Sequence, residues 1–214
     1  MSRGRYERLQ QAWLASTNGL SVLVLLANFL ISFMESFPTT AFTSVLNDDL
    51  HMSLPMISTF YAVEYFPWMW KPLYGWISDN LPIGGYHRKP YIGVGAIGSG
   101  LCYVITAVWV SAAWQIFLVR FSCNVFSACL QLMVGAFLVD VARSNTKNSV
   151  ALQGVANAAG WLGSGTSQIM ALAVYAHPGL GEKSSHGVSA RAAIALTAVA
   201  PAVLVVLTPF FPEV

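Results

Sequence analysis

The chain has 214 residues, of which 56% are hydrophobic and only 9% are charged, and its formal net charge is +2. A soluble domain carries about 25% charged residues, so this composition excludes a soluble globular protein, and the small net charge calls for no nucleic-acid partner. The sequence therefore predicts an integral, multi-pass membrane protein in a lipid bilayer.

Six apolar runs follow one another along the chain, and a spanning α-helix needs about 20 apolar residues. Barrel strands would alternate polar and apolar residues over about ten positions, and these runs do not. We therefore expect an all-α transmembrane fold, a six-helix bundle, between a basic N-terminal segment (1–19) and a short tail (212–214). The expected spans are 20–45, 55–77, 91–110, 114–141, 150–176 and 192–211.

Lysine and arginine lie mostly on one side of the expected bundle. Seven belong to the N-terminus and to the second and fourth loops: Arg3, Arg5, Arg8, Arg88, Lys89, Arg143 and Lys147. The opposite side has two, Lys183 and Arg191. Because short cytoplasmic loops carry the excess of basic residues, we expect both termini on the cytoplasmic or equivalent side of a membrane that the sequence does not name.

Polar residues inside the spans form stripes at helical spacing. The stripe of the first span contains Asn28, Ser32, Glu35, Thr39 and Thr43; that of the fourth contains Arg120, Asn124, Ser127 and Gln131; a weaker one in the fifth contains Gln153, Asn157, Ser164 and Gln168. Steps of three and four residues place each stripe on one helical face. The stripes either pack against other helices or line a water-filled cavity, and the buried charges favour a cavity between the first and fourth spans.

Four charged residues within the spans balance one another: Glu35 and Glu64 against Lys71 and Arg120. At 1.5 Å per residue, Arg120 and Glu64 both lie about 10 Å below the outer surface, and Glu35 lies deeper. Arg120 is thus expected to pair with either acid, whereas Lys71 lies near the inner end, where only Asp140 matches its depth. The candidate binding or cavity residues are Asn28, Glu35, Glu64, Lys71, Arg120, Asn124 and Gln131.

The stretch "GVGAIG" (93–98) has dinucleotide-fingerprint spacing, but it lies in a membrane span and follows no strand. We expect its glycines, like Ala156, Gly160 and Ser164 in the fifth span, to let another helix approach closely. The three cysteines have no CxxC spacing, which supports neither a metal site nor a disulfide framework. No nucleophile, metal cluster or phosphate loop indicates an enzyme, and we expect no cofactor.

The turn between the second and third spans carries a specific resemblance. Gly75, Asp79, Gly85, Arg88 and Lys89 resemble the loop between helices two and three of the major facilitator superfamily. The longer stretch "PWMWKPLYGWISDNLPIGGYHRKPY" (67–91) resembles the signature of the folate-biopterin transporter family within it. Three further stretches support the resemblance: "LNDDLHMS", "LVDVARSN" and "LQGVANAAGWLG".

The resemblance implies a proton- or gradient-coupled carrier of pteridines or folates, with twelve helices in two halves and with helices one and four of each half lining the cavity. This chain stops at "PFFPEV" after six spans, so we expect a half-size carrier that works as a dimer or with a second half. The expected contact with that half is the small-residue surfaces of spans three and five, together with the end near Asp79. Arg120 and Lys71 would bind the anion, and Glu35 or Glu64 would couple transport to an ion.

One departure from the family pattern favours a different function. The family has two acids in helix four that fall at Gln131 and Gly135 in this chain, which would leave Lys71 without its counter-charge. The alternative is therefore a structural subunit of a larger membrane complex, derived from such a carrier but not transporting.

Overall fold

The protein is described by a computed structural model, which places residues 17–144, 149–175 and 187–211. The expected N-terminal segment lies almost wholly outside the described residues, as do the tail, Lys147 and Lys183. Within the described ranges the secondary structure is helical, apart from two isolated bridges, Ile83 with Tyr86 and Tyr175 with Val188. The all-α transmembrane fold expected from the sequence is confirmed.

The first span is built from three consecutive segments: α2 (Thr17–Ser36), α3 (Thr39–Ser44) and a π-helical turn, η1 (Val45–Asp49). The interruption between α2 and α3 falls at Pro38, which has no backbone N–H to continue the ladder of helical hydrogen bonds. Together the three segments cover the predicted span of 20–45 and extend it by three residues at its start and four at its end.

The second span is broken in the middle, whereas the sequence predicted one helix over 55–77. It consists of α4 (Leu54–Glu64), the 3₁₀ turn η2 (Phe66–Trp70) and α5 (Lys71–Asn80). Pro67 lies in the break; a proline inside an α-helix removes one hydrogen bond, and its ring clashes with the carbonyl four residues earlier. The expectation of a continuous helix was wrong for this reason.

The remaining spans are α6 (Lys89–Val108), the 32-residue α7 (Ala113–Ser144), α8 (Ser149–Val174) and a last span of three segments, α9 (Ala190–Thr197), α10 (Val199–Leu207) and η4 (Thr208–Phe210). Four stretches of the described chain are long and apolar enough to cross a membrane: Val22–Asp49, Lys89–Val108, Ala113–Val139 and Ala190–Phe210. They correspond to the first, third, fourth and sixth predicted spans; membrane crossing by the second and fifth stays a prediction.

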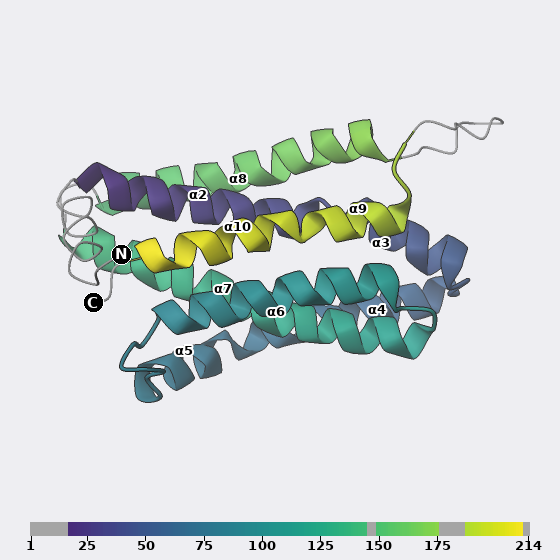
Figure 1. The fold of residues 1–214 in the computed structure, drawn as a ribbon, viewed down its shortest axis with the longest axis horizontal. Coiled ribbons are helices and arrows are strands. Elements are labelled where there is room, and N and C mark those ends of the chain that lie inside the picture. The colour runs from purple at the N-terminus through teal and green to yellow at the C-terminus, as the bar shows by residue number, and fades with distance from the viewer. Residues whose placement is uncertain (1–16, 145–148, 176–186, 212–214) are drawn as a thin grey trace, which may run out of the picture.

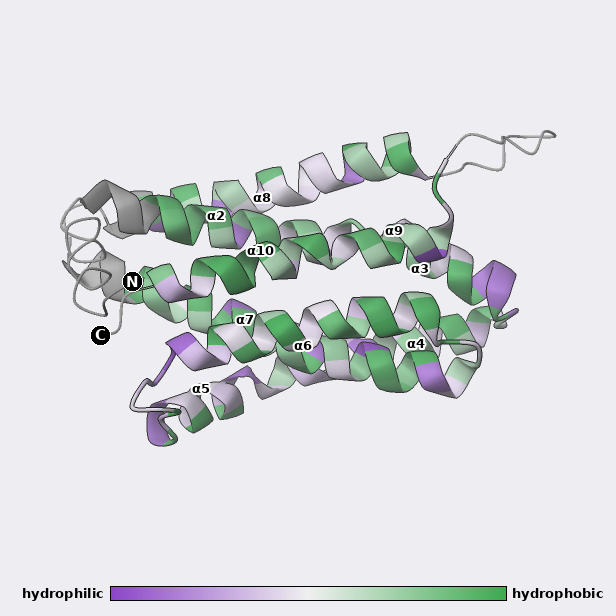
Figure 2. Ribbon diagram, in the orientation of Figure 1, coloured by the Kyte–Doolittle hydropathy of each residue, from purple (hydrophilic) through white to green (hydrophobic). Residues whose placement is uncertain are grey.

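The helices lie side by side in an elongated bundle (Figure 1). α2 packs along α8 and α6 packs along α7, while α10 contacts both α2 and α6 and so joins the two pairs. α2 begins and α10 ends at the same end of the bundle, where the α5–α6 turn also lies. Figure 2 shows hydrophilic residues gathered at that turn and at the far end near α3, and largely hydrophobic helices between them.

The small residues of spans three and five bring helices of this chain together. A Cβ added at Gly98 of α6 would lie 2.5 Å from the ring of Phe126 on α7, and one at Gly163 of α8 would clash with the carbonyl oxygen of Phe29 on α2. The hydroxyl of Ser36 donates a 3.0 Å hydrogen bond to Ser164 across the same contact. Our expectation that these surfaces meet a second half was wrong, because neighbouring helices of the chain already cover them.

Candidate functional site

An ion pair between α4 and α7 forms the centre of the candidate site. The guanidinium of Arg120 donates to the carboxylate of Glu64, and the side chains are only 11% and 4% exposed. Glu64 is the last residue of α4, where the negative end of the helix dipole disfavours a carboxylate. Arg120 therefore neutralises the charge of Glu64 and offsets the unfavourable interaction of this carboxylate with the helix dipole. Of the two acids that the sequence offered as partners, the structure brings Glu64 to Arg120.

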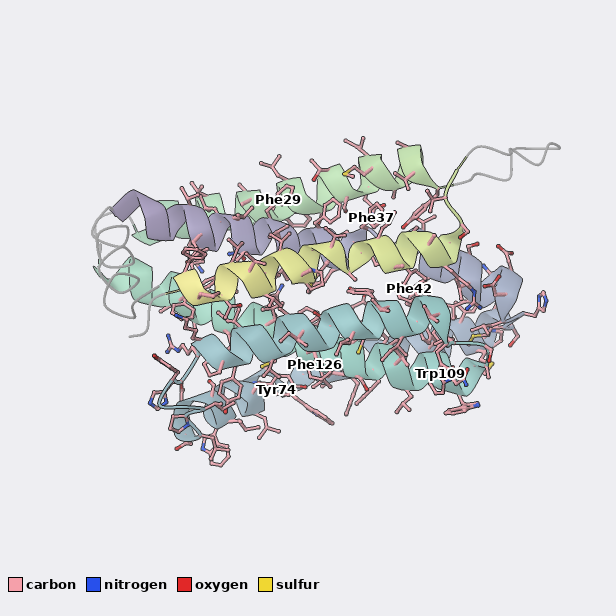
Figure 3. All side chains as sticks on the ribbon, viewed as in Figure 1. Phe29, Phe37, Phe42, Tyr74, Trp109 and Phe126 are labelled. Carbon is pink, nitrogen blue, oxygen red and sulfur yellow. The ribbon has the colours of Figure 1, made fainter. Side chains whose placement is uncertain are left out.

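Two further groups hold this ion pair in place. The amide of Asn124, one turn along α7, donates to the same oxygen of Glu64 at 3.3 Å and to the Arg120 carbonyl at 3.0 Å. The guanidinium carbon of Arg120 lies 4.1 Å from the ring centroid of Phe42 on α3, a cation–π distance. Figure 3 labels Phe42 among the side chains of the bundle. Residues from three spans thus meet at Arg120.

Lys71 joins the same network from the other side of the helix break. Its amine donates to the side-chain oxygen of Gln131 at 2.5 Å and lies 4.3 Å from the ring centroid of Trp68. The indole N–H of Trp68 donates to Asn124 at 2.7 Å, which links Lys71 to the ion pair. The sequence offered Asp140 as the acid at the depth of Lys71; its side chain lies outside the described residues, so that pairing stays a prediction, and among the described residues the structure brings Lys71 against the neutral Gln131.

Glu35 is the charged residue of the first stripe, and it lies within electrostatic reach of both Lys71 and Arg120. Its oxygen Oε1 is buried and accepts no hydrogen bond from the described residues. Oε2 of Glu64 is likewise buried without a donor among the described residues, and Nε of Arg120 is buried without an acceptor among them. Buried polar atoms are nearly always hydrogen-bonded, so three unpartnered atoms in one cluster indicate a site that water or a polar ligand completes.

The break in the second span shapes this cluster. The α4 helix ends at Glu64 and α5 begins at Lys71, so a negative residue lies at a negative helix end and a positive residue at a positive one. Both placements are unfavourable. The hydroxyl of Tyr74 donates to the carbonyl of Pro67 at 3.1 Å, which satisfies one backbone group freed by the break. Interrupted helices inside membrane proteins occur where they line a cavity or are buried in protein.

The other predicted residues have separate places. The amide of Asn28 donates to the carbonyl of Val24 on its own helix at 2.9 Å, so its link to the cluster stays a prediction. The polar stripes of the first and fourth spans lie on α2, α3 and α7, and α2 contacts α7. Sequence reasoning missed Trp68 and Phe42, although Trp68 could have been found from its place one helical turn before Lys71.

The predicted loop motif lies away from this cluster, at the turn between α5 and α6. Gly85 has φ +84° and its neighbour Gly84 has φ +65°, a conformation that favours glycine. Ile83 and Tyr86 exchange backbone hydrogen bonds across them at 2.9 and 3.2 Å. Lys89 donates to the carbonyl of Pro209 at 2.7 Å, which ties the turn to the last span. The remaining motif residues are Gly75 and Asp79 within α5 and Arg88 at the start of α6.

Asp79 lies near the C-terminal end of α5, where a basic side chain such as Arg88 would offset its charge; that pairing stays a prediction. Gly75 faces α7, where an added Cβ would make an ordinary van der Waals contact with Leu132 at 3.5 Å. The loop motif therefore joins α5, α6 and the last span, and it contributes none of the side chains of the charged cluster.

Comparison with known proteins gives consistent matches. The sequence model of the BT1 family matches residues 33–213. "Probable folate-biopterin transporter 4" of Arabidopsis thaliana is 34% identical over 137 residues, which are 61% of this chain and 27% of the relative. "Folate-biopterin transporter" of Synechocystis sp. is 24% identical over 134 residues, again 27% of its length. "Probable folate-biopterin transporter 9, chloroplastic" of Arabidopsis thaliana is 45% identical over 58 residues, 26% of this chain and 11% of the relative. The chain thus spans about a quarter of the length of the first two relatives.

Proposed function

The chain belongs to the BT1 family, and from that premise we propose that its helices form one half of a carrier for folate- or pterin-like organic anions. The two longest matches are to proteins named as folate-biopterin transporters. A second six-helix half, either another copy of the chain or a different sequence, would complete the translocation path. The observation that carries the proposal is the buried charged cluster with three unpartnered polar atoms.

Arg120 is the residue that we assign to anion binding. Its terminal nitrogen is engaged by Glu64, but its Nε–H is buried and donates to none of the described residues. A carboxylate of the substrate could accept from this group, and such charge-assisted hydrogen bonds are about twice as strong as neutral ones. Lys71 adds a second positive charge, which faces the neutral amide of Gln131.

Glu35 is the residue that we assign to coupling. Glu64 is held by Arg120 and Asn124, whereas Glu35 has a buried carboxylate oxygen without a described partner beside two cations. Taking up a proton at Glu35 would remove one negative charge from the cluster and so strengthen its attraction for an anion. Binding of a proton or cation at Glu35 would therefore raise the affinity for the anionic substrate, and its release would lower that affinity.

Uptake by the reconstituted protein tests this function. We expect saturable uptake of a folate or a pterin. Uptake of the folate should fall about tenfold or more in Arg120→Gln, because a hydrogen bond to a charged group is lost, and should change little in the surface variant Arg191→Gln. Glu35→Gln should keep or strengthen binding, because it removes the same negative charge as protonation does, and it should abolish the dependence of uptake on an imposed proton gradient. Lys71→Gln should weaken binding less than Arg120→Gln does. Uptake that does not respond to Arg120 would contradict the assignment.

A second function is favoured by one observation. Lys71 bonds an amide at Gln131, where the resemblance implies an acid in the family. A chain that has lost this charge pair could serve as a structural subunit of a larger membrane complex. In that case no oligomer would take up folate or pterin, and deleting the chain would destabilise a complex that co-purifies with it.

A further inference from the structure

A pocket of about 420 Å³, lined by both polar and apolar side chains, opens near the end of the first span, and the function proposed above does not use it. Its walls come from α3 and η1, from Tyr175 after α8, and from Val188 and Ala190 at the start of α9. Segments far apart in the sequence thus meet here, at the end of the bundle opposite the α5–α6 turn (Figure 1). The volume lies in the range of small-molecule sites, about 300–1,000 Å³.

The π-helical turn η1 gives the pocket its most polar wall. The amide of Leu50 donates to the carbonyl of Val45 at 3.0 Å, five residues back, and such turns are frequent at functional sites. Asn47 and Asp48 lie on this turn, both exposed and both lining the pocket. Ser44 donates to Oδ2 of Asp48 at 2.8 Å, which orients the carboxylate without neutralising it.

Three hydroxyl groups of the pocket already donate to backbone carbonyls. Thr39 donates to the carbonyl of Glu35 at 3.4 Å and Thr43 donates to the carbonyl of Thr39 at 3.1 Å. The Tyr175 hydroxyl donates to the carbonyl of Phe37. Each hydroxyl has a single hydrogen and two lone pairs, so these three groups can still accept from a ligand. Together with the carboxylate of Asp48 they offer acceptors for the N–H groups of a ligand, and Thr40 and Asn47 in the same lining carry donors.

Charge at the rim disfavours an anion. None of the lining residues is basic. Arg191 follows the lining residue Ala190, but its guanidinium donates to Asp49 at 2.7 Å and to the carbonyl of Val110 at 2.7 Å. An anion in the pocket would thus meet the carboxylate of Asp48 without a compensating cation.

We propose that this pocket binds the pterin ring of the substrate, with Asp48 accepting from the adjacent amino and ring N–H groups of the pyrimidine edge. A carboxylate accepts two parallel N–H bonds from such an edge as it does from a guanidinium. This inference rests on the proposed function and divides recognition between two places. The ring binds at this pocket, and the carboxylates of a folate bind at Arg120.

The helical stretch that carries Asp48 also reaches Arg120, through Phe42. Phe42, against which Arg120 packs, and Asp48 belong to the same continuous helical stretch. Six residues separate them, which corresponds to about 9 Å along a helix at 1.5 Å per residue. A folate carries its carboxylates at the far end of a long molecule and can contact both places. Biopterin has the ring and no carboxylate, so it should depend on the pocket alone.

Equilibrium binding of biopterin and of folate to the purified protein in lipid nanodiscs tests the proposal, with Asp48→Asn as the variant and Asp49→Asn as its neighbouring control. We expect Asp48→Asn to weaken biopterin binding tenfold or more, Asp49→Asn to leave it unchanged, and Asp48→Glu to recover part of the loss, which shows that the carboxylate and not the fold is responsible. Arg120→Gln should weaken folate binding and spare biopterin.

The failures of the two proposals differ. Wild-type binding of biopterin that Asp48→Asn does not change, or that Asp49→Asn weakens equally, overturns the pocket and leaves the carrier intact. Absence of binding of both compounds to the wild-type protein overturns the pocket together with the proposed function.

Discussion

Arg120 and Arg191 each pair with an acid, but in different surroundings. The Arg120–Glu64 pair is almost fully buried, whereas in the Arg191–Asp49 pair the side chains are 35% and 41% exposed. Water screens the second pair and solvates either partner when the other is removed. Inside the bundle the remaining charge has no such solvent. Substitutions in the two pairs can therefore be compared to measure how burial changes the contribution of an ion pair to stability.

We predict that Arg120→Ala lowers the free energy of unfolding by about 3–5 kcal/mol because it leaves a buried carboxylate unpaired. Arg191→Ala should lower it by at most about 1 kcal/mol. Denaturant unfolding in detergent micelles measures both. Adding Glu64→Gln to Arg120→Ala should restore part of the loss, whereas adding Glu35→Gln should restore less. Equal losses from the two arginine variants would contradict the buried pairing.

Lys71 provides a second residue-level prediction, because its hydrogen-bond acceptor is the neutral Gln131. Gln131→Glu should stabilise the protein by giving the lysine a carboxylate. The same substitution should destabilise it in a Lys71→Gln background, where the new carboxylate has no cation. Contacting residues show coupling energies of about 0.5–3 kcal/mol in such double-mutant cycles. Additive effects would show that the two side chains do not interact.

At the level of the helices, glycines decide how closely α2 and α8 approach. Gly163 faces the backbone of Phe29, while two residues along the same helix Gly165 has nothing within 4 Å of an added Cβ. The two positions have the same residue type and lie in the same helix. They differ only in the face on which they lie.

Gly163→Ala should therefore push α2 and α8 apart and destabilise the protein by about 1–3 kcal/mol, as overpacking does. Gly165→Ala should be neutral or stabilise by up to about 1 kcal/mol, because alanine favours a helix over glycine. Thermal unfolding of the two purified variants makes the comparison. A destabilised Gly165→Ala would mean that a further surface covers this face of α8.

The whole molecule is expected to cross the membrane six times, with the basic loops on the cytoplasmic or equivalent side. A reporter fused after Val214 and a reporter inserted at Lys183 should then lie on opposite sides, the first with the basic loops. Protease protection or a side-specific label distinguishes the two positions. Finding both reporters on one side would refute the six-span topology.

The assembly of the molecule is the other prediction at this scale. A single half would leave one side of a carrier's cavity open, so the gently purified protein should run as a dimer or within a larger complex. Native mass spectrometry measures this directly. The contact surface should involve neither Gly98 nor Gly163, because helices of the same chain cover them. A monomer that transports by itself would refute the need for a second half.

The sequence by itself determined the properties that depend on composition and on local spacing. The scarcity of charge required a membrane, and runs of apolar residues required helices, because an unsatisfied backbone is too costly in lipid. Steps of three and four residues placed Glu35 on one polar face and Arg120 on another. Proline at position 67 was a visible signal for the break in the second span, although we read that span as continuous.

Only the tertiary structure decided which of these faces meet. Depth along a helix could not separate Glu35 from Glu64 as the partner of Arg120, because hydrogen bonding depends on fractions of an ångström and on which helix lies beside which. The same holds for Lys71, which meets Gln131 where the second span lies beside the fourth, and for the small-residue surfaces, whose partners are helices of the same chain. The pocket near the end of the first span joins residues between 39 and 48 to Tyr175, Val188 and Ala190, a proximity that arises from packing and that no local pattern encodes.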